Sequence, residues 1–143
     1  MSNNRLITLE ILGLDELVRN LTRQTQLNKA RALDEIGQYF TSEVLQRFAR
    51  SEDHEGRAWK PLKYRVGKPL VNTGILRSSI THRILNDSVE VGTNVTYAAI
   101  HNYGGRAGRN RRVTIPQREF MGISETNEKE IIEIAEKHLN TRR

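Results

Sequence analysis

The feature that most constrains the fold is an amphipathic segment between residues 29 and 50. Its large apolar side chains recur at intervals of three and four residues, which places them on one stripe of an α-helix: Leu33, Ile36, Phe40, Val44, Leu45 and Phe48. Because only 36% of the 143 residues are hydrophobic, few other apolar faces are available to build a core. We therefore expect a helix from about Lys29 to Arg50 at the centre of a single domain spanning residues 1–143.

Shorter segments predict the remaining elements. Strands are expected at 5–11, 81–85, 88–93 and 113–115, short helices at 14–21, 74–80 and within 95–103, and a hairpin turn at Asn86-Asp87. The 74–80 helix is expected to bury Ile75, Leu76 and Ile80. Ser124 is a candidate N-cap for a last helix whose buried side would hold Ile131, Ile132, Ala135 and Leu139. The predicted fold class is α+β, an antiparallel sheet with the long helix and the C-terminal helix on one face.

The positive charge of the chain is concentrated in its middle. The whole chain carries a formal charge of +6, but residues 56–118 alone carry +10, between flanks of −2 each. Such a distribution indicates an anionic partner, either nucleic acid or the acidic face of another protein or subunit. Five arginines in this region are candidate contacts to that partner: Arg106, Arg109, Arg111, Arg112 and Arg118.

The segment 104–112 is predicted to be a mobile, exposed basic loop. It contains three glycines and four arginines among nine residues, and its one apolar side chain is Ala107. Such a composition offers no large apolar side chain that could be buried in a core. By contrast, Trp59 beside Pro61 is predicted to anchor its own loop onto the core. A base-stacking role for Trp59 between lysines is the alternative.

Several kinds of catalytic site are excluded or disfavoured. The chain has no cysteine, so thiolate metal sites and cysteine nucleophiles are excluded. Its four histidines lack helical metal-ligand spacing, and neither a phosphate-binding loop nor a serine-nucleophile motif occurs. His101 with Tyr103 is a residual acid–base candidate. We expect a protein without enzymatic activity, cofactor or membrane span, working in a reducing compartment.

Four short motifs occur in a fixed order along the chain. They are GRAWKPL at 56–62, LVNTGILRSSI at 70–80, VEVGTNVTYAAIHNYGG at 89–105 and IPQREFMGIS at 115–124. This succession resembles the phage virion morphogenesis or tail-completion family of Mu-like and P2-like phages and prophages. Gln117 and Glu119 depart from the family's Ile-Pro-Ala-Arg-Pro-Phe pattern, which bears on the neighbour contacts of the Arg118 loop.

The resemblance implies a structural protein that completes the tail and stabilises the head–tail junction. It implies a cyclic homo-oligomer, with a hexamer as one candidate, that contacts other tail and head-connector proteins. The protein would occur in the bacterial cytoplasm during assembly and afterwards in the virion. The basic middle of one subunit facing the acidic flanks of the next would suit such a ring. Two other functions stay open: phosphate contacts to nucleic acid through the 104–112 arginines, and a small hydrolase or nuclease centred on His101.

Overall fold

The computed structural model describes residues 7–11, 23–63, 67–71, 73–85 and 88–139. Its strands are β1 (Ile7–Ile11), β2 (Thr81–Ile84), β3 (Val89–Thr93), β4 (Gly105–Ala107) and β5 (Val113–Ile115). Its helices are α2 (Arg23–Arg50), α3 (Ile75–Ser78), α4 (Ala98–Tyr103) and α5 (Glu125–Leu139), with a 3₁₀ turn, η1, at Arg109–Arg111. The helix predicted at 14–21 and the turn at Asn86-Asp87 lie outside the described residues. The α+β class is confirmed.

The main sheet is antiparallel and three-stranded, in the order β1-β3-β2. Its central strand, β3, is buried along its whole length. The prediction that residues 113–115 would join this sheet is wrong, because β5 pairs with β4 in a separate two-stranded sheet. Closing a short loop onto the preceding segment costs less chain entropy than reaching a distant sheet edge, which favours this local pairing.

Helix α2 is the longest element and begins six residues before the predicted start. The polar residues ahead of Lys29 continue the helix rather than interrupting it. The predicted apolar stripe is confirmed in the core, with Leu33, Ile36, Phe40, Val44 and Phe48 all at 0% exposure. Part of this stripe packs with Trp59, Val91 and Phe120, and the rest packs with β3 and α5.

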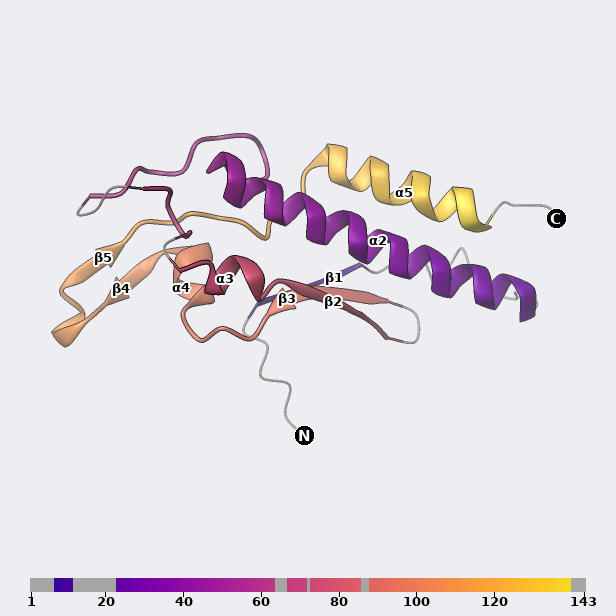
Figure 1. The fold of residues 1–143 in the computed structure, drawn as a ribbon, viewed down its shortest axis with the longest axis horizontal. Helices are drawn as coiled ribbons and strands as arrows, with labels where there is room; N and C mark the ends of the chain where they lie inside the picture. Colours follow the sequence, from indigo (N-terminus) through magenta and orange to yellow (C-terminus); the bar gives the residue numbers. More distant parts are fainter. Residues whose placement is uncertain (1–6, 12–22, 64–66, 72, 86–87, 140–143) are drawn as a thin grey trace.

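Helix α5 runs antiparallel to α2. Lys137 near its end contacts Glu35 near the middle of α2, whereas Asn127 near its start contacts Arg47 in the last turn of α2. Both helices lie on the same side of the main sheet (Figure 1), where Ile131, Ile134 and Ala135 share a cluster with Val89 of β3.

Two residues predicted to be buried are exposed. Ile132 is 52% exposed and Ile75 is 57% exposed, whereas Ile134, Leu76 and Ile80 are buried. Ile75 lies in α3 and Ile132 in α5, and in both of these helices the apolar residues span a wider arc than the side that faces the core. The packing of α5 on α2 therefore selects Ile131 and Ile134 and leaves Ile132 outside.

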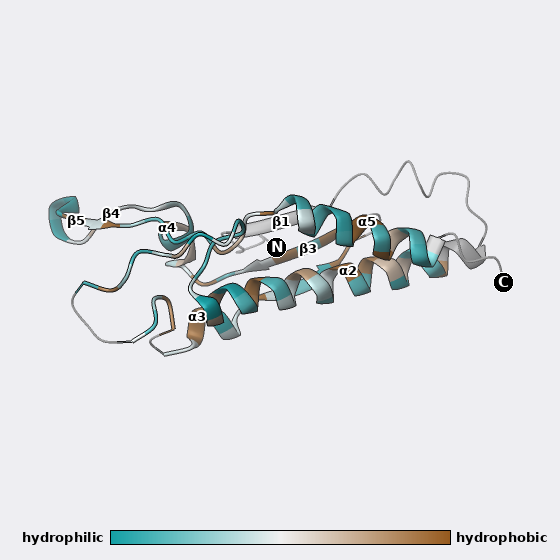
Figure 2. Cartoon of the chain, turned by 90° about the horizontal axis from the view of Figure 1, so that it is seen from above, coloured by the Kyte–Doolittle hydropathy of each residue, from teal (hydrophilic) through white to brown (hydrophobic). Residues whose placement is uncertain are grey.

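The molecule is elongated. The β4–β5 hairpin projects from one end of the long axis, and α2 and α5 extend toward the other (Figure 1). In the view from above, the hairpin tip is strongly hydrophilic (Figure 2).

Candidate functional site

The hairpin formed by β4, η1 and β5 presents a cluster of positive charge. Its pairing is regular, with Arg106 opposite Thr114 and Ala107 opposite Val113. The turn needs left-handed backbone, which Gly108 supplies at φ 80° and Asn110 at φ 58°. Four of the five candidate arginines are exposed on this hairpin: Arg106, Arg109, Arg111 and Arg112. The segment predicted to be a loop therefore holds one strand and the turn of a hairpin, and these guanidinium groups gather at one end of the molecule.

The fifth candidate, Arg118, is placed differently. Its side chain is 7% exposed. The Nε atom donates to the carbonyl oxygen of Lys60 at 2.8 Å, and Nη2 donates to that of Pro61 at 3.0 Å. Its backbone N–H donates to the carbonyl oxygen of His101 at 2.8 Å. Arg118 therefore ties the base of the hairpin to the 60–63 loop and to α4, and we leave it out of the surface cluster.

A largely apolar groove of about 650 Å³ lies between the 60–63 loop and β5. Pro61 and Leu62 line one side, and Val113, Ile115 and Pro116 line the other. Lys60 and Lys63 add positive charge to its lining. Val113 is 51% exposed, so part of this apolar surface faces solvent. We call it the β5 groove.

Trp59 holds the loop that leads into the β5 groove. It is 6% exposed and its ring packs edge-on against Phe48, with centroids 5.7 Å apart. The indole N–H donates to the carbonyl oxygen of Glu119 at 2.9 Å. A ring buried in this way leaves little face on which a nucleic-acid base could stack.

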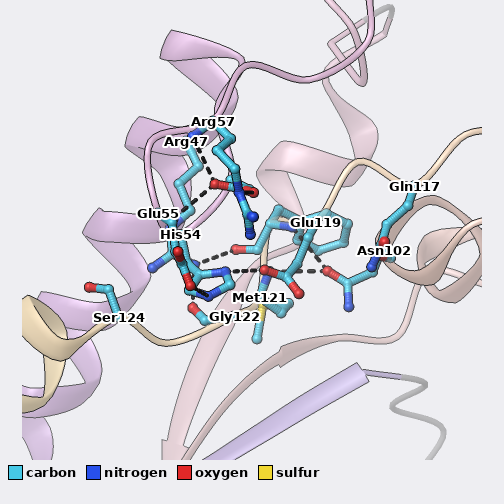
Figure 3. A network of polar contacts seen from close by, with 12 residues as sticks. Arg47, His54, Glu55, Arg57, Asn102, Gln117, Glu119, Met121, Gly122 and Ser124 are labelled. Carbon is cyan, nitrogen blue, oxygen red and sulfur yellow. Dashed lines mark hydrogen bonds and ion pairs between the residues drawn. The ribbon is translucent and has the colours of Figure 1, made fainter.

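A network of polar contacts fixes residues 117–124, which connect β5 to α5 (Figure 3). Asn102 of α4 accepts two hydrogen bonds at Oδ1, from the backbone N–H of Phe120 at 3.0 Å and of Met121 at 3.1 Å. Arg47 of α2 donates to the carbonyl oxygens of Phe120 and Gly122. A Cβ at Gly122 would collide with the side chains of His54 and Glu119, so a larger residue there would have to displace both of them. Residues 117–124 are thereby held by α4, by α2 and by the loop that carries His54.

The same network contains a histidine–carboxylate pair. His54 Nδ1 contacts Glu119 Oε1, although the two residues are 65 positions apart in the sequence. Asp53 lies beside them. Burial raises the pKa of its carboxyl, but the backbone N–H groups of Arg57 and Glu55 outweigh this and lower it overall. Among the described residues, no group of three histidine or acidic side chains is arranged to hold a metal ion. This contact joins the loop that carries His54 to residues 117–124 and is therefore part of the network that fixes them.

His101 lines a cavity of about 450 Å³ that Arg118 also lines. The cavity also contains Tyr97, whose ring packs edge-on against the imidazole at 5.9 Å. His101 Nδ1 is buried without a hydrogen-bond partner. Burial lowers the pKa of the imidazole, and the charge of Arg118 lowers it further. Burial and a nearby cation account for the lowered pKa of His101, so the shift needs no catalytic role to explain it.

Sequence reasoning overlooked the polar residues inside the core. Arg47 of α2 is 6% exposed and Asn127 of α5 is 1% exposed, although both side chains are polar. Burial lowers the pKa of the Arg47 guanidinium, and the carboxylates of Glu43 and Glu119 oppose that shift. The one signal in the sequence was Asn127 three residues after the N-cap candidate Ser124, the position from which a side chain can complete a cap.

No helix in the described ranges is both long and apolar enough to span a bilayer.

Comparison with known proteins matches most of the chain. Residues 9–140 match the phage virion morphogenesis family. The chain is 42% identical over 131 residues to "Mu-like prophage FluMu G protein 2" of Haemophilus influenzae, covering 90% of this chain and 92% of that one. It is 30% identical over 142 residues to "Putative capsid assembly protein G" of Escherichia phage Mu, covering 90% and 87%. No solved structure matches. The motifs quoted above lie within the matched range, and the chain belongs to the phage virion morphogenesis family.

Proposed function

We propose that this protein is a non-enzymatic structural subunit that completes the phage tail and stabilises the head–tail junction, assembled as a ring. Membership of a virion morphogenesis family over residues 9–140 carries the proposal. Its partners would be other copies of itself and the tail and head-connector proteins beside it. It would act in the bacterial cytoplasm during assembly and remain in the virion.

The geometry supports assembly better than catalysis. Four exposed arginines lie on a hairpin that projects from the body, whereas the histidine–carboxylate pair lies in contacts that hold the fold together. A rigidly mounted projection suits contact with a neighbouring subunit. In a ring, each subunit must present two different patches, one to each neighbour.

Electron microscopy of particles from a deletion mutant tests the proposal. The expected result is filled heads beside loose tails. A plasmid that carries the wild-type gene should restore joined particles. Normal infectious virions from the deletion mutant would overturn it. Intact tails without properly formed heads would instead indicate a role in the capsid, as the name of the phage Mu relative states for that protein.

A second candidate function is phosphate contact to nucleic acid through the hairpin. The observation favouring it is the gathering of Arg106, Arg109, Arg111 and Arg112 on one projection. Binding to duplex DNA should then weaken steeply with salt, with a log–log slope of about −0.9 for each phosphate neutralised. Replacing all four arginines by alanine should flatten that slope. Unchanged DNA affinity in this variant would remove the candidate.

A further inference from the structure

The outer face of α5 carries an acidic stripe with an apolar residue at its centre. Four exposed residues follow one another at helical spacing: Glu125, Glu128, Ile132 and Glu136. Ile132 is 52% exposed and points away from the cluster that α5 shares with α2. Lys129, one turn before Ile132 and one turn after Glu125, is also exposed, so three carboxylates and one ammonium group surround the isoleucine. The stripe extends over roughly 16 Å at 1.5 Å per residue.

The β5 groove has the complementary character. Its walls are apolar, from Leu62 on one side to Val113 and Ile115 on the other, and it carries the charges of Lys60 and Lys63. Its volume of about 650 Å³ is too small for a whole helix but admits a branched apolar side chain with the adjoining helical turn. Carboxylates one turn before and one turn after such a side chain would lie near the lysines.

These two surfaces cannot meet within one molecule. The groove lies at the hairpin end of the long axis, and α5 extends along the opposite half (Figures 1 and 2). A contact between them must join two copies. Because the two patches differ, the contact is head-to-tail, and its repetition produces a ring if the rotation closes.

We propose that the β5 groove of one copy receives Ile132 and the acidic stripe of α5 from the next copy. This inference rests on the proposed function and specifies which surfaces form its ring. The second copy is favoured as occupant because the opposite charges and the apolar groups needed on both sides are present on the same chain. Nucleic acid would meet the lysines alone, since it offers no branched apolar side chain to the walls of the groove.

Paired charge reversals test the contact. Glu128→Lys with Glu136→Lys makes the stripe basic, and Lys60→Glu with Lys63→Glu makes the groove acidic. Each double variant alone then has like charges on both surfaces and should sediment as the 16.5 kDa monomer, whereas the wild type should sediment as a larger species. An equimolar mixture should regain the wild-type mass, because each reversed surface meets the oppositely reversed one. Recovery in the mixture also shows that both variants are folded.

A matched control lies on the same helix. Glu130 and Glu133 line the cleft between α2 and α5 rather than the stripe. Glu130→Lys with Glu133→Lys makes the same change in net charge and should leave the wild-type mass unchanged.

Three results would overturn the inference: a wild-type chain that stays monomeric at every concentration, reversal variants that keep the wild-type mass, or a mixture that does not reassemble. A reversal variant that still assembles and still joins heads to tails would exclude this contact and leave the proposed function standing. Normal virions from the deletion mutant would remove the proposed function whatever the copies do in solution.

Discussion

Arg47 Nη2 donates a 2.8 Å hydrogen bond to Oδ1 of Asn127, which lies 80 positions later in the chain. The bond joins the last turn of α2 to the first turn of α5 inside the core, where both side chains are almost fully buried. Asn127 also completes the helix cap, since its Oδ1 accepts from the Ser124 N–H and its own N–H donates to Ser124 Oγ. Its side-chain amide donates to Tyr39 and Glu43 of α2. One residue thus connects the cap of α5 to its packing against α2.

Asn127→Ala should lower the free energy of unfolding by about 3 kcal/mol, since it removes the acceptor of the Ser124 N–H in the helix cap and leaves the buried Arg47 guanidinium short of one acceptor. Urea denaturation followed by far-UV circular dichroism measures the loss. Thr126→Ala, at the exposed neighbouring position, should change stability by less than about 0.5 kcal/mol. Equal stabilities of the two variants would show that the network contributes little.

Gly37→Ala should destabilise the protein although it replaces glycine inside a helix. Helix propensity alone would favour alanine by about 1 kcal/mol. However, a Cβ at Gly37 would collide with the His82 ring and lie 2.9 Å from Val89 Cγ2, both in the adjacent sheet. Overpacking of this kind costs about 1–3 kcal/mol, so the net change in unfolding free energy should be a loss. A gain in the melting temperature would refute the close approach of α2 to the sheet. Ser42→Ala, on the exposed side of α2, is the control.

Trp59→Ala should lower the free energy of unfolding by about 3–5 kcal/mol, because it empties the space against Phe48 and removes the bond to the Glu119 carbonyl. Trp59→Phe should cost less, since it keeps an aromatic ring there. Thermal denaturation by circular dichroism gives both values. If Trp59→Ala instead left stability unchanged and weakened DNA binding, the ring would be a stacking platform.

Mild acid should destabilise the protein through His101. Burial, assisted by Arg118, lowers the pKa of the folded imidazole below its ordinary value of 6.5. As pH falls through 6.5, the unfolded chain takes up this proton before the folded protein does, so the free energy of unfolding decreases. His101→Phe should therefore lose less stability than the wild type between pH 7 and pH 5. Parallel pH profiles from urea denaturation would contradict this.

A separate decrease in stability is expected at lower pH. The pKa of Glu35 is lowered by its hydrogen bonds to Lys137 and His138, and that of Asp53 is lowered by backbone N–H groups despite the opposing effect of burial. The stability these carboxylates contribute is present above their unfolded pKa values, 4.5 and 3.8, and is lost as pH falls through their folded values. This window lies below that of His101, so the two effects can be separated in one titration.

Elements whose pattern depends only on neighbours in the sequence were predictable. The apolar residues of α2 recur with the helical period, the Ser124 cap precedes α5, and the strands 81–85 and 88–93 follow one another closely. The four arginines of 104–112 were identified by composition, and the structure exposes all four. The order of four motifs also indicated the family that the comparisons show.

The sequence by itself determined where the helices and most strands form, how the charge is distributed and to which family the chain belongs, because these follow from local spacing and residue type. Only the tertiary structure decided that Ile132 is exposed while Ile134 is buried, and that β5 pairs with β4. It also decided that Arg47 and Arg118 are buried while the hairpin arginines are exposed. Each of these outcomes depends on which surface of another element packs against the residue. A buried charge is tolerated only where carbonyl and amide oxygens from distant parts of the chain form hydrogen bonds with it.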